Sequence, residues 1–575
     1  MMDLDGISLE LMRSRLQSVV DEAGATLVRT AHAHIIREVK DFAIALADAR
    51  GRPVVSTQTI PVFLGTIPTT IKRFLEHFPL DSMGAGDVMI TNDPWLGAGH
   101  LTDVNILMPL YDGEGVVGFV IVVAHMADIG GAVNLSPHSH ELFEEGLRIP
   151  MMKLVDAGNR NQTLIALVAA NVRVPTEVVG DLDAMMAAAR VVSGRAAVIL
   201  QTLAPNALND LNDELYRRGE AAMRLAIHQL RSGSYIDSLE IEGVDVPVTL
   251  VVRCDVDADT STIIIDFEGT SGQVRSAINC THSYTLSYAL YLLKCLLVPH
   301  LPLVQGMFLP ITVRTPERSV LNCSYPAAVG ARNLVGQSST ALLMRALAGA
   351  IPENAIAECG APRPFIIMTG QRLDGNPFSV PMPVMGGFGG RPMSDGPSAL
   401  PFPTNTEAMS VEVFEASAPL LIEEKELVCD SGGAGRYRGG LGQRIRLRAL
   451  IDGIQVSIAS QKTRIPPVGL FGGLPGACAR VAFRRHGGED SDDHGVQILR
   501  QGDEVIVESP GGGGYGEPRS REPHLVARDV AGGYVSEVQA REIYGLEVGA
   551  GHKSRLSPRM GVTAGDPVAM KASDG

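Results

Sequence analysis

Apolar positions near the start of the chain repeat first with helical and then with strand-like spacing. Over residues 8–36, apolar side chains recur at intervals of three and four residues, which predicts an amphipathic helix. Two compact apolar runs follow at 41–48 and 53–58, separated by a glycine-containing turn, and this order predicts a β-hairpin with Asp41 at its mouth. The same patterns predict a helix over 66–78, a strand over 87–91 that ends at a turn, a loop over 95–100 and a buried strand over 116–124.

The pattern changes twice in the rest of the chain. Helical spacing dominates residues 160–232, and Gly233 with its neighbouring turn residues indicates a boundary. Alternating apolar residues over 237–270 predict antiparallel strands, and Pro247 inside the first run indicates an edge strand or a bulge. Helices are predicted over 281–298, 335–350 and 522–545, and glycine-rich strands with tight turns from about residue 380 to 507.

These elements predict a multi-domain α+β protein that mixes helices with antiparallel strands and has a glycine-rich, β-containing C-terminal part. A chain of 575 residues is long enough for two to four domains of about 150 residues each. We place an N-terminal metal-bearing α+β domain at 1–232, a central α+β domain at 233–420, and a mostly β part with a terminal helix at 421–575.

Composition excludes several classes of partner. The formal net charge is −15, no basic run occurs, and aromatic residues make up 5% of the chain, so we expect no nucleic-acid partner and no membrane partner. No segment reads as a signal peptide or as an apolar run long enough to span a bilayer. The seven cysteines form no C-x-x-C motif, as is typical of buried thiols in a reducing compartment. We therefore expect a soluble, cytoplasmic protein.

Two copies of a His-x-x-Asp pattern carry the strongest chemical signal. His100 and Asp103 form the first copy, and His125 and Asp128 form the second, 25 positions further on. With Asp41, these residues fall at the ends of predicted strands or in the loops beside them, where side chains from separate segments can converge on one ion. Imidazole and carboxylate ligands suit zinc, manganese or ferrous iron.

The alternative interpretation is that the histidines are ordinary core or surface residues and that the carboxylates stabilise turns. The sequence leaves three roles open for Asp128: metal ligand, partner that orients a histidine, or turn former before Gly130 and Gly131. His138 and His140, two positions apart, could reach the same site or could belong to an exposed loop.

Glycine clusters elsewhere are better explained by backbone geometry than by ligand binding. Gly511, Gly513 and Gly516 satisfy G-x-G-x-x-G after an apparent strand, but Pro518 follows where a nucleotide-binding motif would open a helix. We expect a tight structural turn there. The sequence contains neither a P-loop nor the G-x-S-x-G motif of serine hydrolases.

Six motifs together resemble the hydantoinase B/5-oxoprolinase B family. They are NDPWLGAGHLTDV at 92–104, AHMADIGG at 124–131, EGLRIP at 145–150, DSGGAGRYRGGLG at 430–442, PPVGL at 466–470 and SPGGGGYG at 509–516. By this resemblance, Asp41, His100, Asp103 and His125 are the metal ligands. Many members have a second histidine where this chain has Met126, so any ligand or proton-carrying role of that position is lost here.

The resemblance also implies an activity and a partner. The B-type subunits of the family belong to ATP-dependent cyclic amidases in which ATP is held by a separate A-type subunit, so we expect a hetero-oligomer. The expected reaction is hydrolysis of a lactam or cyclic imide whose carbonyl oxygen the A-type subunit has phosphorylated, with Asp128 orienting His125 or accepting a proton. Two alternatives stay open: a subunit of an ATP-dependent ketone carboxylase of the acetone or acetophenone type, and a non-catalytic scaffold with a structural metal.

Overall fold

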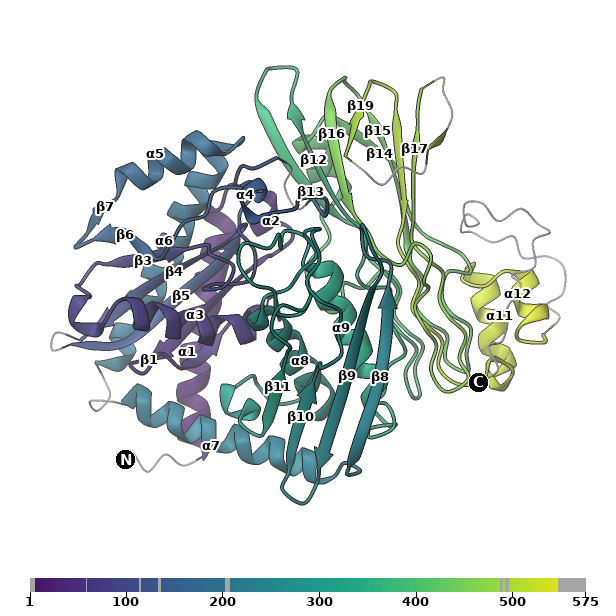
Figure 1. Cartoon of the computed structure of the whole chain (residues 1–575), viewed down its shortest axis with the longest axis horizontal. Helices are drawn as coiled ribbons and strands as arrows, with labels where there is room; N and C mark the ends of the chain where they lie inside the picture. The colour runs from purple at the N-terminus through teal and green to yellow at the C-terminus, as the bar shows by residue number, and fades with distance from the viewer. Residues whose placement is uncertain are drawn as a thin grey trace.

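A seven-stranded antiparallel sheet forms the N-terminal part of the computed structural model (Figure 1). The structure describes residues 6–57, 59–112, 115–132, 136–201, 207–486, 490–491 and 496–546. The strand order is β2-β1-β5-β4-β3-β6-β7. The strands are β1 (Phe42–Asp48), β2 (Pro53–Ser56), β3 (Val88–Thr91), β4 (Asp103–Tyr111), β5 (Val116–His125), β6 (Met152–Asp156) and β7 (Asn159–Arg160).

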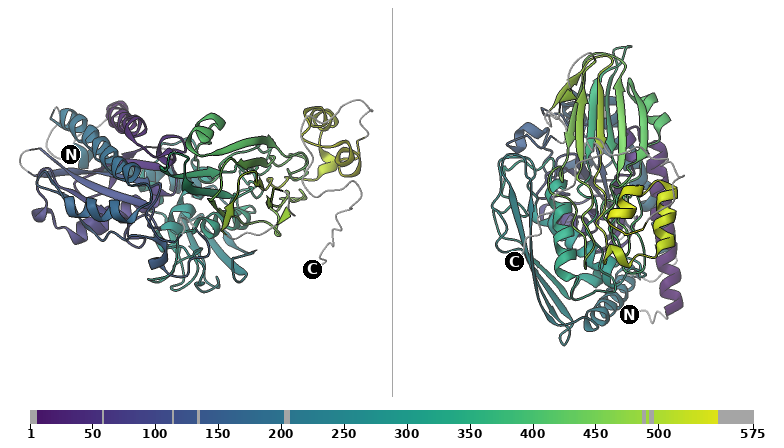
Figure 2. Two further views of the ribbon diagram at one scale, coloured as in Figure 1. Left: turned by 90° about the horizontal axis from the view of Figure 1, so that it is seen from above. Right: turned by 90° about the vertical axis from the view of Figure 1, so that its right-hand side faces the viewer.

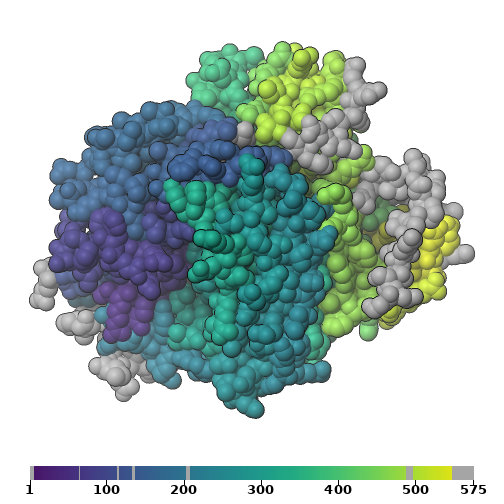
Figure 3. Space-filling model, in the orientation of Figure 1, coloured from purple at the N-terminus to yellow at the C-terminus, as the bar shows by residue number. Residues whose placement is uncertain are grey.

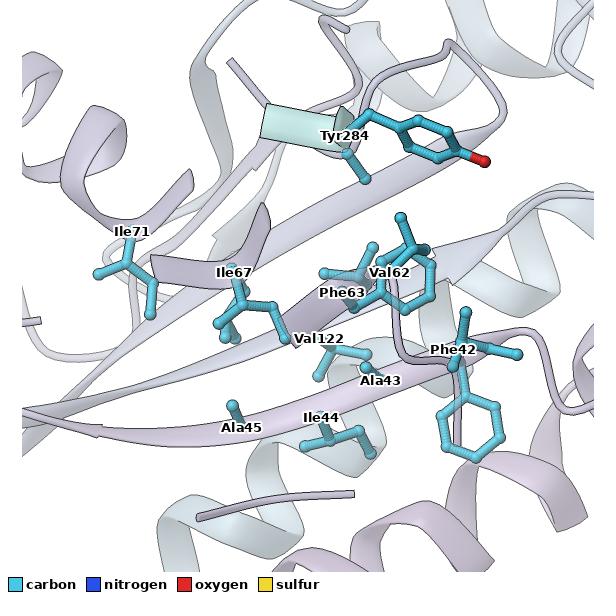
Figure 4. Packing of buried hydrophobic residues seen from close by; sticks show 14 of the residues in the cluster. Phe42, Ala43, Ile44, Ala45, Val62, Phe63, Ile67, Ile71, Val122 and Tyr284 are labelled. Atoms are coloured by element: carbon cyan, nitrogen blue, oxygen red, sulfur yellow. The ribbon is translucent and has the colours of Figure 1, made fainter. Parts of the chain in front are cut away.

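Helices cover both faces of this sheet. Helices α1 (Gly6–Thr30) and α6 (Pro175–Leu200) pack together on one face, and α3 (Phe63–His77) packs against β4 and β5 on the other. Successive side chains of a strand point to opposite faces, so Phe42 and Ile44 point toward the α1 side whereas Ala43 and Ala45 point toward α3 (Figure 4). Short helices complete this part: α2 (His34–Arg37), α4 (Leu142–Glu145) and α5 (Gln162–Asn171).

A second layer begins after α7 (Ala207–His228). Its four-stranded sheet has the order β11-β10-β9-β8, and α9 packs on β8 and β9 while α8 packs on α3. Helix α8 thereby ties this layer to the N-terminal sheet. The elements are β8 (Gly233–Ile241), β9 (Val248–Asp257), β10 (Thr262–Asp266), α8 (His282–Leu297), β11 (Ile311–Arg314) and α9 (Asn333–Leu347).

Two further sheets form the C-terminal part, which projects from the rest of the molecule and ends in two helices (Figures 2 and 3). Their orders are β13-β12-β16-β19 and β14-β15-β20-β17-β18. The strands are β12 (Phe365–Gln371), β13 (Pro377–Pro383), β14 (Leu420–Leu427), β15 (Gln443–Ala449), β16 (Ile454–Ala459), β17 (Arg480–Arg484), β18 (Asp490–Ser491), β19 (Gln497–Leu499) and β20 (Glu504–Glu508). The helices are α10 (Val411–Ser417), α11 (Pro523–Gly532) and α12 (Glu537–Glu542).

Glycine-rich segments between these sheets pack directly on one another. The backbone N–H groups of Gly511, Gly512, Gly513 and Gly514 donate to carbonyl oxygens of three other segments, those of Ala477 and Leu474, of Gly440 and of Glu358. The expectation of a tight turn at 511–516 is therefore wrong for Gly511–Gly514, and of this stretch only Gly516 has a positive φ. Without a Cβ, neighbouring backbones can approach closely enough to hydrogen bond without forming a regular sheet.

Gly439→Ala is expected to lower the free energy of unfolding by about 3 kcal/mol, at the upper end for overpacking. A Cβ at this position would lie 1.9 Å from the Gly512 oxygen, and backbone cannot move aside as a flexible side chain would. Gly194→Ala is the matched control, because this exposed position in α6 has open space and alanine favours a helix over glycine by up to about 1 kcal/mol. Urea unfolding measures both. Equal stability of the two variants would contradict the close packing.

The structure confirms the α+β class, with mixed helices and antiparallel strands in several sheets. The helix expected over 8–36 ends at Thr30. Gln58, the last residue of the expected hairpin, lies outside the described residues. Pro247 immediately precedes β9 and does not interrupt a strand, so the edge-strand or bulge interpretation is wrong: the run over 244–252 is a loop followed by a strand. No helix in the described part of the chain is long and apolar enough to cross a membrane.

Strand β4 has no counterpart among the expected elements, and Pro109 lies within it. Strand β3 pairs only with Asn105–Leu107 of β4, so Pro109 lies where β4 has no neighbour on that side. The largest hydrophobic core includes residues from Leu9 to Ile351 together with Ala459, and it crosses the boundary placed at residue 232. A second core joins the two C-terminal sheets. The domain limits 1–232, 233–420 and 421–575 stay a prediction, and residues 547–575 lie outside the described part.

Candidate metal centre

Strand register brings three of the expected ligands to one end of the N-terminal sheet. Asp103 is the first residue of β4 and pairs with His125, the last residue of β5. Asp41 directly precedes β1, on the other side of β5, and its carbonyl oxygen accepts a hydrogen bond from the His125 N–H at 3.0 Å. His100 reaches the same place from the loop before β4. Adjacent antiparallel strands thus convert distant sequence positions into neighbours.

The donor atoms lie close enough together to share one ion. Asp103 Oδ1 lies 2.9 Å from His100 Nε2 and 2.9 Å from His125 Nδ1, and the ligand atoms of the three residues all lie within 4.8 Å of one another. Two ligands about 2.0–2.2 Å from one cation are separated by roughly 3 Å. All three side chains are buried, and the partly buried Asp41 lines the same cavity. Neutral imidazoles and carboxylates in this arrangement fit zinc, manganese or iron.

The electrostatics keep the donors in the forms that bind a cation. Burial and, next, the positive charge of Arg332 lower the pKa of His100 to about 4, so the imidazole is neutral at pH 7. Burial by itself would raise the pKa of Asp103, but His100 and Arg332 hold it well below its usual value. Burial raises the pKa of Asp41 to about 6, and the nearby charge of Asp103 acts in the same direction. Two carboxylates in one pocket are easier to ionise when a cation lies between them.

A surrounding set of contacts orients the ligands. Arg332 Nη2 donates to Asp103 Oδ2 at 2.7 Å and to the Ala98 carbonyl at 3.1 Å, and the guanidinium lies 4.2 Å from the Tyr284 ring centre. Oδ1 of Asp103 is thereby left to face the two histidines. His100 Nδ1 lies 3.3 Å from the Gly330 carbonyl, and a proton on Nδ1 leaves Nε2, which lies 2.9 Å from Thr102 Oγ1, unprotonated and able to bind a metal.

Glu145 holds the backbone segment whose carbonyl contacts His100. Its Oε1 accepts the N–H groups of Val329 at 2.7 Å and of Gly330 at 2.6 Å, which positions the Gly330 carbonyl beside His100. Burial raises the pKa of Glu145 to about 8, even though those two hydrogen bonds lower it. Glu145 lies in the EGLRIP motif, but neither its role nor those of Arg332 and Tyr284 were expected from the sequence. Arg332 is a charged residue in a mostly apolar segment, and this feature of the sequence could have indicated a buried functional role.

Glu145→Gln is expected to flatten the loss of stability between pH 4.5 and pH 8. In this range the folded protein holds a proton that the unfolded chain, with a carboxyl pKa of 4.5, releases, so the free energy of unfolding falls as pH rises. The amide oxygen of Gln can still accept both N–H groups but does not ionise. Urea unfolding at pH 5 and pH 8 measures the difference, at most about 1.4 kcal/mol per pH unit. The exposed neighbour Glu144→Gln is the control, and parallel curves for Glu145→Gln and the parent would contradict the expectation.

The cavity beside these ligands has a volume of about 90 Å³ and is lined by three distant parts of the chain. Besides Asp41, His100, Asp103 and His125, the residues facing it include Tyr284, Tyr288, Arg332, Gln337, Arg363, Thr404 and Thr406. A larger cavity of about 600 Å³ lies around Glu242 and Arg464 and contains none of the expected ligands. We therefore place the chemistry in the smaller cavity, where the charged groups converge.

The remaining candidates lie outside this cavity. Asp128 is buried, and its carboxylate accepts from the Gly130 N–H and from both the backbone and the side chain of Arg173, so it has the contacts of a turn former. His138 and His140 are exposed, and His138 faces the larger cavity. Met126 is fully buried in the hydrophobic core.

Comparison with known proteins agrees with the sequence motifs. The family model for hydantoinase B/oxoprolinase matches residues 5–518. The putative D-/L-hydantoinase B-type subunit of Pseudomonas sp. (strain NS671) is 30% identical over 573 residues, covering 95% of this chain and 95% of the relative. The crystal structure of the ATP-dependent caprolactamase from Pseudomonas jessenii superposes with a TM-score of 0.89 at 26% identity, covering 96% of this chain and 98% of that one.

A nucleotide-free structure of acetone carboxylase superposes with a TM-score of 0.88, covering 96% of this chain and 81% of that chain. At 19% sequence identity, this likeness shows a shared fold. The family match extends over most of the chain and includes every segment that lines the cavity beside His100. The chain therefore belongs to the hydantoinase B/oxoprolinase family.

Proposed function

We propose that this chain is the metal-bearing B-type subunit of an ATP-dependent cyclic amide hydrolase of the hydantoinase, oxoprolinase or lactamase type. The observation that carries the proposal is the convergence of His100, Asp103 and His125, with Asp41 beside them, in a buried cavity. The relatives named as a putative hydantoinase and as an ATP-dependent caprolactamase support the reaction class. The sequence contains no P-loop, which supports ATP binding by an A-type partner and a hetero-oligomeric enzyme.

Each residue of the cavity has a part in this proposal. Asp41, His100, Asp103 and His125 would hold one divalent ion of zinc, manganese or iron, with two negative charges and two neutral nitrogens. When bound, such an ion supplies Lewis acidity, which lowers the pKa of water from ~15.7 toward ~7. Arg332 keeps Asp103 ionised and oriented, and the Gly330 carbonyl selects the tautomer of His100. Tyr284, Tyr288 and Phe365 line the wall and exclude bulk water from the substrate.

In this scheme the A-type partner phosphorylates the carbonyl oxygen of a lactam or cyclic imide, and the activated ring is opened by water in the cavity of this chain. Asp128 has no part in the reaction, because Arg173 and Gly130 occupy its carboxylate. The proposal places the complex in the cytoplasm, where ATP is available.

The test is to purify the chain together with an A-type subunit, measure its metal content, and assay hydantoins, lactams and aryl ketones with ATP. We expect about one divalent ion per chain and ATP-dependent ring opening. Bicarbonate-dependent carboxylation of a ketone would instead identify a ketone carboxylase component. Removing the metal with a chelator distinguishes a catalytic metal from a structural one. If the metal is catalytic, the chain should lose activity and stay folded, whereas a chain with a purely structural metal would unfold.

A further inference from the structure

One buried arginine of the cavity has no carboxylate partner. Arg363 lies just before β12, is 5% exposed, and faces the same cavity as His100 and Asp103. Its Nη1 donates to Thr404 Oγ1 at 2.9 Å and its Nη2 donates to Thr406 Oγ1 at 2.6 Å, while Nε is buried without a partner. Among the described residues, no carboxylate forms a salt bridge with this guanidinium. Burial lowers its pKa to about 10, so it remains charged at pH 7.

The other buried arginines of the described part are all paired. Arg332 pairs with Asp103, Arg444 with Glu508, and Arg438 and Arg521 both pair with Asp529. Burying a charge without a counter-charge is unfavourable, so the fold elsewhere supplies a carboxylate to every buried guanidinium. Arg363 is the exception: Asp41, which lines the same cavity, acts on it electrostatically without forming a salt bridge, so an anionic ligand in the cavity could still pair with the guanidinium.

Two threonines hold this guanidinium in a fixed orientation. Thr404 Oγ1 donates to the Pro401 carbonyl at 2.9 Å, which directs an oxygen lone pair toward Arg363, and Thr406 Oγ1 lies 3.2 Å from Thr404 Oγ1. These partners are neutral, so the guanidinium forms no ion pair with either of them. A planar guanidinium presented in this way suits the oxygens of a phosphoryl or carboxylate group.

The charges of the cavity indicate how much negative charge a ligand should bring. The guanidiniums of Arg332 and Arg363 balance the carboxylates of Asp41 and Asp103. A divalent ion on the four ligands therefore leaves two uncompensated positive charges in a buried volume of about 90 Å³. A dianionic phosphoryl group would neutralise both charges, and a carboxylate would neutralise one. This count relies on the proposed function for the divalent ion, whereas the unpaired state of Arg363 does not.

We propose that Arg363, held by Thr404 and Thr406, is the anion receptor of this cavity and selects small organic substrates that carry a phosphoryl or carboxylate group. Its part is to position the substrate: the guanidinium binds the oxyanion, and the rest of the molecule extends toward His100 and His125. In the reaction proposed above, the phosphoryl group placed on the ring carbonyl by the partner is such an oxyanion, and a ring carboxylate is the other source.

The test compares binding of inorganic phosphate and of acetate to the metal-loaded full chain by isothermal titration calorimetry. We expect one of the two anions to bind the parent, and Arg363→Met to weaken that binding by about 10- to 100-fold, as for a lost hydrogen bond to a charged group. Phosphate as the bound anion assigns the receptor to a phosphoryl group, and acetate assigns it to a carboxylate. Arg363→Lys should retain part of the affinity because it keeps the charge.

Controls separate this role from a structural one. Arg372→Met removes an arginine that donates to the Ser417 carbonyl outside the cavity, and it should leave anion affinity unchanged. Metal content and the thermal unfolding temperature of Arg363→Met should not fall, because Thr404 and Thr406 keep other partners and a buried charge is removed. Arg363→Gln replaces the Met variant should the latter fail to fold.

Two results would overturn the proposed role of Arg363. In the first, neither anion binds the parent. In the second, the affinities of Arg363→Met and Arg363→Gln for the bound anion both stay within twofold of the parent's affinity. A chain that binds no metal would contradict the proposed function, and the same titrations on that metal-free chain would still decide the role of Arg363.

Discussion

His100→Ala is expected to remove the metal from the chain and to lower the rate of ring opening by about 1000-fold or more, which corresponds to losing a Lewis acid worth several kcal/mol. His100 Nε2 lies 2.9 Å from Asp103 Oδ1, and its Nδ1 faces the Gly330 carbonyl, so the substitution removes one of the two imidazoles of the cluster. Metal content by elemental analysis and the ATP-dependent rate of the complex are measured together.

The matched control is His77→Ala, which removes an exposed imidazole at the end of α3. It should retain the metal and the full rate. Nucleotide binding by the A-type subunit should survive in both variants, since His100 lies in a cavity of this chain. A His100→Ala protein that opens rings at the parent rate without metal would refute the proposed function.

Asp103→Asn is expected to abolish metal binding and also to destabilise the folded chain by about 3–5 kcal/mol. The Asp103 carboxylate contacts both histidines and accepts a hydrogen bond from the Arg332 guanidinium at 2.7 Å. The side chains of Asp103, the two histidines and Arg332 are all buried. An amide keeps the shape but carries no charge, so Arg332 is left buried without a counter-charge. Urea unfolding of chelator-treated proteins measures the stability change without any contribution from the metal.

A double-mutant cycle with Arg332→Met distinguishes the loss of stability from the loss of metal binding. Adding Arg332→Met to Asp103→Asn removes the unpaired charge, so we expect the double variant to recover part of the lost stability. It should not recover the metal, because the amide remains. Additive stability losses in the cycle would show that the Arg332–Asp103 pair is not the source of the destabilisation.

The elements with strong periodicity were predictable from sequence, and those decided by long-range pairing were not. The hairpin of β1 and β2 and the strand β5 follow from continuous apolar runs, because helices cover both faces of their sheet, and the helices α3 and α8 follow from apolar positions at helical spacing. Strand β4 was missed. It contains Pro109, which is tolerated because β3 pairs with only the first part of β4. The stretch Gly511–Gly514 was misread as a turn because its hydrogen-bond partners lie in other segments.

The candidate site was also predictable from the sequence only in part. Local sequence patterns were sufficient to single out His100, Asp103, His125 and Asp41, and strand order β1-β5-β4 then brings them together. The two His-x-x-Asp copies looked equivalent in sequence, yet Asp103 faces the cavity whereas Asp128 pairs with Arg173. The difference arises because Asp103 begins a strand beside His125, while Asp128 lies in the turn beyond that strand.

By itself, the sequence determined the α+β class, most of the helices, the family and the residues that we propose as metal ligands, because these depend on local spacing and on residue type. Only the tertiary structure decided which charged groups surround those ligands. Arg332, Glu145 and Arg363 come from segments far from His100 in the chain, and their roles follow from burial, where an ionised group must find a partner in the protein or in a bound ligand.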